Sequence, residues 1–101
     1  MNREEVQTML EGILGSKNVY FQEPPNTGMK YPCIVYNFSN FHRENADNKP
    51  YITIPRWEIH HMYKSIKNDL KDTMLLAAPY VSFDRRVKHD GVYNDYYTIY
   101  Q

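Results

Sequence analysis

Residues 79–100 read Pro79-Tyr80-Val81-Ser82-Phe83-Asp84-Arg85-Arg86 and, after Val87 and a Lys88-His89-Asp90-Gly91 break, Val92-Tyr93-Asn94-Asp95-Tyr96-Tyr97-Thr98-Ile99-Tyr100. The two segments are densely loaded with tyrosine and predict a β-hairpin. Tyrosine combines a large apolar ring with a polar tip, so strands that carry it on both faces suit a sheet that is covered on one side and meets another protein on the other. This stretch indicates assembly rather than catalysis.

The composition favours a single domain that spans residues 1–101 and holds one compact core. Twelve Lys and Arg balance twelve Asp and Glu, so the formal net charge is +0 and we expect no global attraction to nucleic acid or anionic lipid. The single cysteine, Cys33, lies in an apolar run and is expected to be a buried, reduced thiol. Aromatic residues make up 15% of the chain, so we expect some rings to face a partner.

The N-terminal residues do not read as a signal peptide. The longest apolar run, Met74 to Ala78, is far shorter than the roughly 20 residues that a membrane span requires. We therefore expect no membrane association and a protein that is soluble in the cytoplasm when it is made.

The spacing of apolar residues predicts two helices. The first begins at a capping-box pair, Asn2 and Glu5, and ends at Gly15. Its apolar stripe consists of Val6, Met9, Leu10, Ile13 and Leu14. The second helix is expected to have about three turns and to end before Pro79. Its stripe consists of Ile66, Leu70, Met74 and Ala77.

Three strands are expected between the helices, at Val19–Phe21, Cys33–Ser39 and Tyr51–His61. Pro55 implies that the third strand runs at a sheet edge or contains a bulge midway, because proline cannot donate to a neighbouring strand. The polar stretch from Asn40 to Pro50 is too long for a tight turn and too rich in Asn and charge for a core. We expect it to be a projecting loop.

Together these elements predict an α+β two-layer fold, in the order α-β-β-β-α-β-β, with a mainly antiparallel sheet and both helices packed on one face. The opposite face would carry the surplus tyrosines. At least one outer strand would present open backbone groups that a neighbouring subunit could pair with or cover.

The sequence offers no catalytic, cofactor-binding or metal-binding motif, and we expect a protein that is not an enzyme. His60 and His61 are neighbours on an expected strand, so their side chains point to opposite faces and cannot bind one metal together. Asp84 and Asp90 lie beside the basic residues of the hairpin and are the one charged cluster that could hold an acid/base pair or a nuclease-like site. A hairpin of mixed charge is more typical of an exposed edge or a salt-bridge patch between subunits.

Three stretches carry a resemblance to a known family. They are Ile13 to Gln22, Met29 to Tyr36 with the downstream Ala46 to Tyr51, and Pro79 to Arg85 with the tyrosine-rich strand that follows. They resemble the small tail terminator proteins of tailed bacteriophages, which are also called tail completion or head–tail joining proteins. The resemblance covers nearly the whole chain and rests on structural signatures. The sequence departs from the family between Trp57 and Ala78, a region that is shorter and more loop-like in the family.

The resemblance implies a structural virion protein that forms a ring, usually a hexamer, at the head-proximal end of the tail tube. Such a ring ends polymerisation of the tube and joins the tail to the head connector. The implied partners are sister copies, the tail tube protein and the head connector or stopper protein, with room for non-specific contact with DNA that passes through the lumen. Assembly in the host cytoplasm and a final location in the virion tail are implied as well.

A closed ring requires one edge of a subunit to meet a different edge of the next. We expect the tyrosine-rich hairpin to pack between subunits and the polar loop to reach an adjacent ring or the lumen. The subunit-interface residues of this hypothesis are Arg85, Arg86, Tyr93, Tyr96, Tyr97 and Tyr100, with both arginines paired to carboxylates of a neighbour. The loop residues are Phe41, His42, Arg43, Glu44, Asn45, Asp47 and Lys49.

Three alternatives stay open. Another head–tail connector, an adaptor or a stopper, would show the same features and differ only in the ring that it touches. A small nucleic-acid-binding or nuclease-like domain could use the locally basic segment Arg85 to His89 with aromatic rings to stack on bases. The third alternative is an interaction module of a host cell with no connection to a phage.

Overall fold

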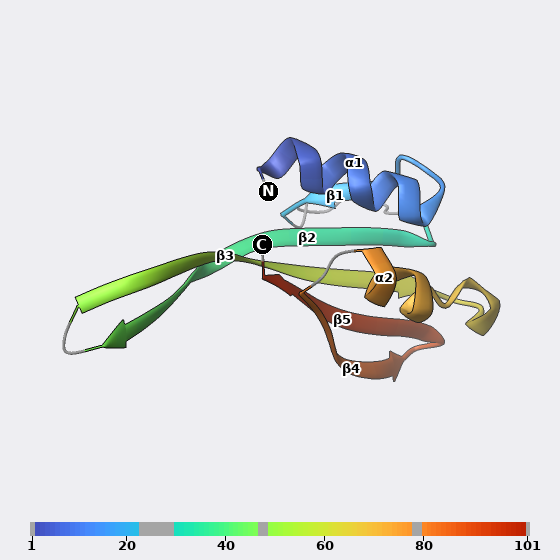
Figure 1. Ribbon diagram of the computed structural model, residues 1–101. Helices are drawn as coiled ribbons and strands as arrows, with labels where there is room; N and C mark the ends of the chain where they lie inside the picture. Colours follow the sequence, from blue (N-terminus) through green and yellow to red (C-terminus); the bar gives the residue numbers. More distant parts are fainter. Residues whose placement is uncertain (1, 23–29, 47–48, 78–79, 101) are drawn as a thin grey trace.

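A computed structural model describes residues 2–22, 30–46, 49–77 and 80–100, and it has the predicted α+β fold and element order (Figure 1). The helices are α1 (Arg3–Leu14) and α2 (Lys71–Ala77), with a short 3-10 helix, η1 (Ile66–Asn68), between β3 and α2. The strands are β1 (Val19–Phe21), β2 (Cys33–Ala46), β3 (Lys49–Tyr63), β4 (Val81–His89) and β5 (Val92–Tyr100).

All five strands form one sheet in the order β1-β2-β3-β5-β4. β1 runs parallel to β2, and the other neighbours are antiparallel. The outer strands β1 and β4 therefore lie at opposite edges of the sheet. Both helices pack on the same face, because side chains from α1 and α2 enter one hydrophobic cluster with residues of β2, β3 and β5.

The first helix forms as its sequence predicts. The Asn2 side chain accepts a hydrogen bond from the Glu5 backbone at 2.8 Å, and Glu5 accepts one from the Asn2 backbone at 3.0 Å, which satisfies two amides that a helix start leaves without partners. At the other end Gly15 has φ +78°, a left-handed conformation that suits glycine. The fully buried face of α1 is formed by Val6 and Leu10.

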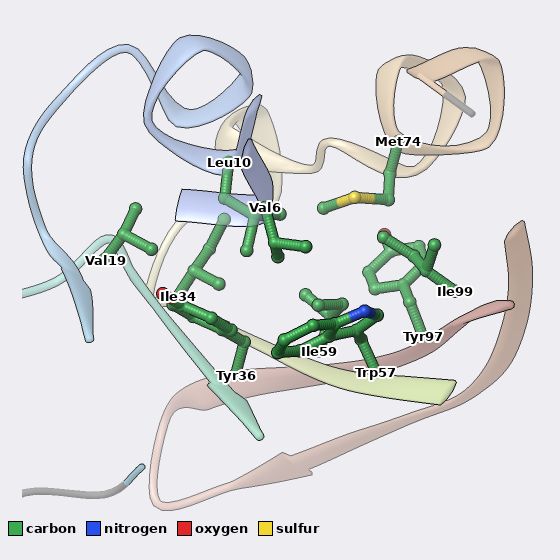
Figure 2. Packing of buried hydrophobic residues seen from close by; sticks show 10 residues of the cluster. All are labelled: Val6, Leu10, Val19, Ile34, Tyr36, Trp57, Ile59, Met74, Tyr97 and Ile99. Atoms are coloured by element: carbon green, nitrogen blue, oxygen red, sulfur yellow. The ribbon is translucent and has the colours of Figure 1, made fainter. Parts of the chain in front are cut away.

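The core lies between the helices and the sheet. Figure 2 shows Val6 and Leu10 of α1 and Met74 of α2 reaching toward aromatic and aliphatic side chains that rise from the strands. The remaining buried members of this cluster are Val19, Ile34, Tyr36, Trp57, Ile59, Tyr97 and Ile99. Three aromatic side chains, those of Tyr36, Trp57 and Tyr97, belong to this cluster, and their large apolar areas supply much of its packing.

The predicted loop from Asn40 to Pro50 is wrong in its conformation, because the described part of this stretch is strand. β2 continues to Ala46 and β3 begins at Lys49, and their pairing continues through Arg43↔Thr53 and Glu44↔Ile52. Polar residues are compatible with this pair of strands, because strands that project into solvent need no buried face. The prediction that the stretch projects is correct in Figure 1.

Pro55 lies at an edge of the sheet, one of the two positions that the sequence predicts. β5 pairs with β3 only as far as Arg56, and Pro55 is opposite Phe41 of β2, so it needs no partner on its other side. A register shift in β2 between Phe38 and Asn40 bends the ribbon close to this point.

The second helix is shorter than predicted. Asp69 takes an extended conformation with ψ 125°, which ends η1 and separates it from the seven residues of α2. The Asp69 carboxylate instead accepts a hydrogen bond of 2.9 Å from the backbone of Lys71, at the start of α2. As a result Ile66, expected on the apolar stripe, is 51% exposed, whereas Met74 is buried as predicted.

Candidate interface surfaces

The tyrosine-rich hairpin, β4 with β5, forms as predicted, but its turn has two residues rather than the four of the predicted break, because Lys88 and His89 are paired residues of β4. Asp90 and Gly91 have φ +51° and +76°, the two positive values that match the twist of antiparallel strands. This turn places His89 opposite Val92, and counting outward from it brings Arg86 opposite Asp95. One residue, Asp84, is then extra in β4 and forms a bulge between Phe83 and Arg85.

The bulge decides which β4 side chains face the helices. Phe83 pairs with Tyr97 and packs against the core, while Arg86 pairs with Asp95 on the same face. An even-numbered and an odd-numbered residue of one strand share a face only if an extra residue lies between them. Arg85 consequently faces the opposite, helix-free side of the sheet, where its guanidinium lies 4.4 Å from the ring centre of Tyr96.

The four β5 tyrosines of the interface hypothesis divide between the two faces. Tyr97 is 1% exposed and belongs to the hydrophobic core, so we withdraw it as a subunit-interface residue. Tyr93, also on the helix side, is stacked on Tyr63 with 5.2 Å between ring centres. By strand alternation Tyr96 and Tyr100 lie on the helix-free side, and both are half-buried.

Arg86 is bound within its own domain rather than presented to a neighbour. Its Nε and Nη2 donate to the two oxygens of Asp95 at 2.7 and 3.0 Å, and Nη2 also lies 2.9 Å from an oxygen of Asp69. Asp95 has no exposed surface, so this planar, two-point contact compensates a buried charge. The contacts raise the pKa of Arg86 above its ordinary value. The arginine part of the interface hypothesis therefore rests on Arg85 alone.

A buried polar cluster surrounds this ion pair, and it was not predicted. Tyr63 donates to Asp95 at 2.8 Å, and burial together with this bond raises the pKa of the Tyr63 hydroxyl. His61 is opposite Asp95 on β3, is fully buried, and is stacked on Tyr63 at 4.5 Å, but neither of its ring nitrogens has a hydrogen-bond partner among the described residues. Burial lowers the pKa of His61 to about 4, so the ring is neutral at pH 7.

The helix-free face carries a row of stacked planar groups. His60, Tyr96 and Arg85 are cross-strand neighbours on β3, β5 and β4. The His60 ring stacks on Tyr96 at 4.4 Å, and its Nε2 lies 2.9 Å from the amide oxygen of Asn94. Because Arg85 also lies against Tyr96, the row is packed within the domain, and nucleobases would have to displace it in order to stack there.

Beside this row is a depression of about 310 Å³. Its polar lining consists of Asn37, Glu58, His60, Asp84, Arg85, Tyr96 and Thr98. Asp84 accepts hydrogen bonds from the hydroxyls of Ser82 and Thr98, so its carboxylate is used to hold the bulge. Asp90, in the turn, is 86% exposed and pairs with His89 at 3.2 Å. The two aspartates, six residues apart along the hairpin, do not form the acid/base pair that the sequence left open.

The β2–β3 ribbon is the second surface feature of the molecule. We call residues 41–46 and 49–55 the arm. Beyond Arg56 neither β1 nor β5 reaches it, so among the described residues its two strands pair only with each other and both of its outer edges are open. The arm extends the molecule to 48 Å along its longest axis, against 24 Å along the other two. Its predicted contact residues Phe41 to Asn45 and Lys49 lie on these paired strands, whereas Asp47 lies outside the described residues.

Other predicted features can be placed as well. Cys33 is fully buried, as expected, and burial raises the pKa of its thiol to about 11. Within the described ranges, no group of three His, Cys, Asp or Glu side chains is arranged to hold a metal ion. The helices in those same ranges are too short or too polar to cross a membrane.

Comparison with known proteins gives no family assignment, since no family model, curated protein or solved structure matches this chain.

Proposed function

We propose that this protein is a structural subunit of a ring-shaped connector, acting as the tail terminator at the head-proximal end of a phage tail tube. In this role copies of the chain close into a ring, with six members as the family resemblance implies, that ends polymerisation of the tube and joins it to the head connector. The observation that carries the proposal is the arm.

An isolated two-stranded hairpin is only marginally stable in water. Within the part of the chain that the structure describes, the arm has two open edges and neither helix lies over it in Figure 1. Its sequence nevertheless includes Phe41, Tyr51, Ile52 and Ile54, which a permanently solvated ribbon does not require. These properties are those of a segment that is completed by another molecule, through strand pairing or by packing of its faces.

The second unpaired edge is the outer edge of strand β4. This strand pairs with β5 on one side, and no other described strand pairs with it on its outer side. Six of its nine residues, Asp84 to His89, are exposed. A subunit with an arm at one end and an open strand at one edge has two different surfaces to offer, as a head-to-tail ring requires.

The first test is direct observation of the purified protein by electron microscopy and by light scattering after size-exclusion chromatography. We expect rings with an open lumen, formed alone or on the ends of polymerised tail tube protein. A compact monomer that neither forms rings nor binds tube ends would overturn the proposal.

The second test removes the arm. His42 and Ile54 are cross-strand partners, so residues 43–53 can be replaced by an Asn-Gly turn that joins them. We expect the shortened chain to keep the circular dichroism spectrum and melting temperature of the parent but to lose ring formation and to leave tube polymerisation unchecked. A shortened chain that unfolds, or that still forms rings and stops tubes, contradicts the role given to the arm.

The same assembly assay separates the terminator role from that of an adaptor or stopper. A terminator binds the end of a polymerised tail tube, whereas an adaptor or stopper binds the head connector and leaves the tube free to grow. Binding to the connector ring without any effect on tube length would therefore replace the proposed role with the alternative.

A further inference from the structure

A shallow groove, largely open to solvent, lies between the two helices. It has a volume of about 590 Å³ and lies between the N-terminal half of α1 and the end of α2. We call it the helix groove; it is lined by Asn2, Glu4, Glu5, Thr8, Met9 and Ala77. Leu76, which precedes the lining residue Ala77 on α2, is 87% exposed, the highest value among the large hydrophobic residues that the structure describes.

The helix groove combines apolar surface with negative charge. Met9 and Ala77 supply its apolar part, and Glu4 and Glu5 are both exposed in the first turn of α1. Glu5 is held by the capping box, while Glu4 forms no ion pair within the described residues. A complementary partner would present a positive charge beside an aliphatic side chain.

The chain itself carries such a surface on its other side. Arg85, Val87 and His89 alternate along β4 on the helix-free face, and we call them the β4 stripe. Val87 is 45% exposed. Arg85 is exposed and forms no ion pair within the described residues, and its guanidinium lies 4.4 Å from the ring centre of Tyr96. A planar guanidinium in such a contact can still donate to a carboxylate.

The two surfaces lie apart in the fold. The groove lies on the helix side of the sheet, where α1 contacts β1 and β2 and α2 contacts β4, whereas the stripe faces the opposite, helix-free side. One copy therefore cannot use its own stripe to fill its own groove. Two unlike, complementary surfaces on different sides of one chain are what a head-to-tail contact between identical copies needs.

We propose that the helix groove of one copy binds the β4 stripe of the next, with Val87 against Leu76 and Met9, and Arg85 against Glu4. The inference rests on the proposed ring and names the contact between its subunits. It concerns one contact between neighbours within the ring, and the arm adds a second contact that does not use this surface.

Charge exchange tests the pairing. Glu4→Arg and Arg85→Glu should each lower the fraction of oligomer in size-exclusion chromatography with light scattering by about tenfold or more at equal concentration. The chain that carries both substitutions should recover assembly, because the exchanged charges meet again. Lys17→Glu changes an exposed charge outside both surfaces and is the matched control, expected to assemble as the parent does.

Cysteine crosslinking tests the geometry. A chain with both Leu76→Cys and Val87→Cys should form a ladder of disulfide-linked multimers under mild oxidation. Each single variant should remain uncrosslinked, since a head-to-tail contact brings together two different positions. The native Cys33 is fully buried and should give no background.

The outcomes distinguish this inference from the proposed function. If the parent protein forms no oligomer, alone or on tube ends, both are overturned. If the parent assembles but neither charge exchange weakens it and the double-cysteine chain gives no ladder, the ring stands and this contact is wrong. Dimers formed by a single-cysteine variant would indicate a two-fold contact and would also overturn the inference.

Discussion

Arg86 and Asp95 are cross-strand partners on β4 and β5, joined by two hydrogen bonds of 2.7 and 3.0 Å, and the carboxylate has no exposed surface. Arg86 also reaches Asp69, just before α2, so one guanidinium joins the edge of the sheet to the start of the second helix. Burial alone would raise the pKa of Asp69, but hydrogen bonds from the Lys71 backbone and from Arg86 outweigh it and hold the pKa below its ordinary value. The ion pair is therefore part of what holds α2 against the sheet.

The neighbouring arginines should differ sharply in their effect on stability. Arg86→Ala leaves Asp95 buried without its cation and should lower the free energy of unfolding by about 3 kcal/mol, because an unpaired buried charge is costly. Arg85→Ala removes a contact on the exposed face and should cost less than about 1 kcal/mol. Urea unfolding monitored by tyrosine and tryptophan fluorescence compares the two variants. An equal loss of unfolding free energy in both would contradict the stabilising role of the Arg86–Asp95 pair.

Stability should fall as the pH is lowered from about 6.5 to about 4, because of His61. The folded chain keeps this ring neutral with a pKa of about 4, whereas the unfolded chain takes up a proton near the ordinary value of 6.5. The unfolded state thus binds more protons across this window, so the free energy of unfolding decreases there by up to about 3 kcal/mol, and His61 contributes no pH dependence above it.

His61→Phe should remove most of that pH dependence, since phenylalanine keeps the stacking on Tyr63 and has no nitrogen to protonate. His89→Gln is the control, because His89 is 80% exposed and should leave the profile unchanged. Unfolding free energies at pH 7 and pH 4.5 provide the comparison. A parent protein with equal values at both pH values would contradict the buried, neutral state of His61.

Cys33 should be unreactive in the native protein. Its thiol is fully buried and its pKa is raised to about 11, so the reactive thiolate is scarce at pH 8. We expect a thiol reagent such as dithionitrobenzoate to modify it only as fast as the chain unfolds, and within the mixing time in urea. Rapid modification of the folded protein would mean that this part of the sheet opens readily.

The arm should exchange its amide hydrogens faster than the rest of the sheet in the free subunit. Its strands pair only with each other, whereas the part of β3 from Trp57 to Met62 has partners on both sides. In the assembled ring the arm amides should become protected if the arm is completed by another molecule. Mass spectrometry of deuterium uptake before and after assembly measures this, and arm amides that stay unprotected in the ring count against the proposed role of the arm.

Local sequence signals determined the elements that need no distant partner. Asn2 and Glu5 cap α1 through bonds to each other's backbone, and Gly15 ends it, so this helix was predicted with its bounds. The Asp90–Gly91 turn likewise determines the register of the terminal hairpin, because a two-residue loop leaves one way to pair the strands next to it. If the strand residues are paired outward from this turn, Arg86 is opposite Asp95, so this pair could have been predicted from the sequence.

The tertiary structure decided which face each residue serves. Tyr96 and Tyr97 are adjacent and chemically identical, yet one lies on the helix-free side and the other is sealed in the core, because strand alternation assigns faces only after the position of the helices is known. The bulge at Asp84 has the same origin, since packing of Phe83 under α2 and pairing of Arg86 with Asp95 are satisfied together only with an extra residue between them. The strand conformation of the arm was not predicted, because a polar composition indicates only that a segment is not buried. The arm is held by backbone hydrogen bonds between its strands, which most polar residues permit.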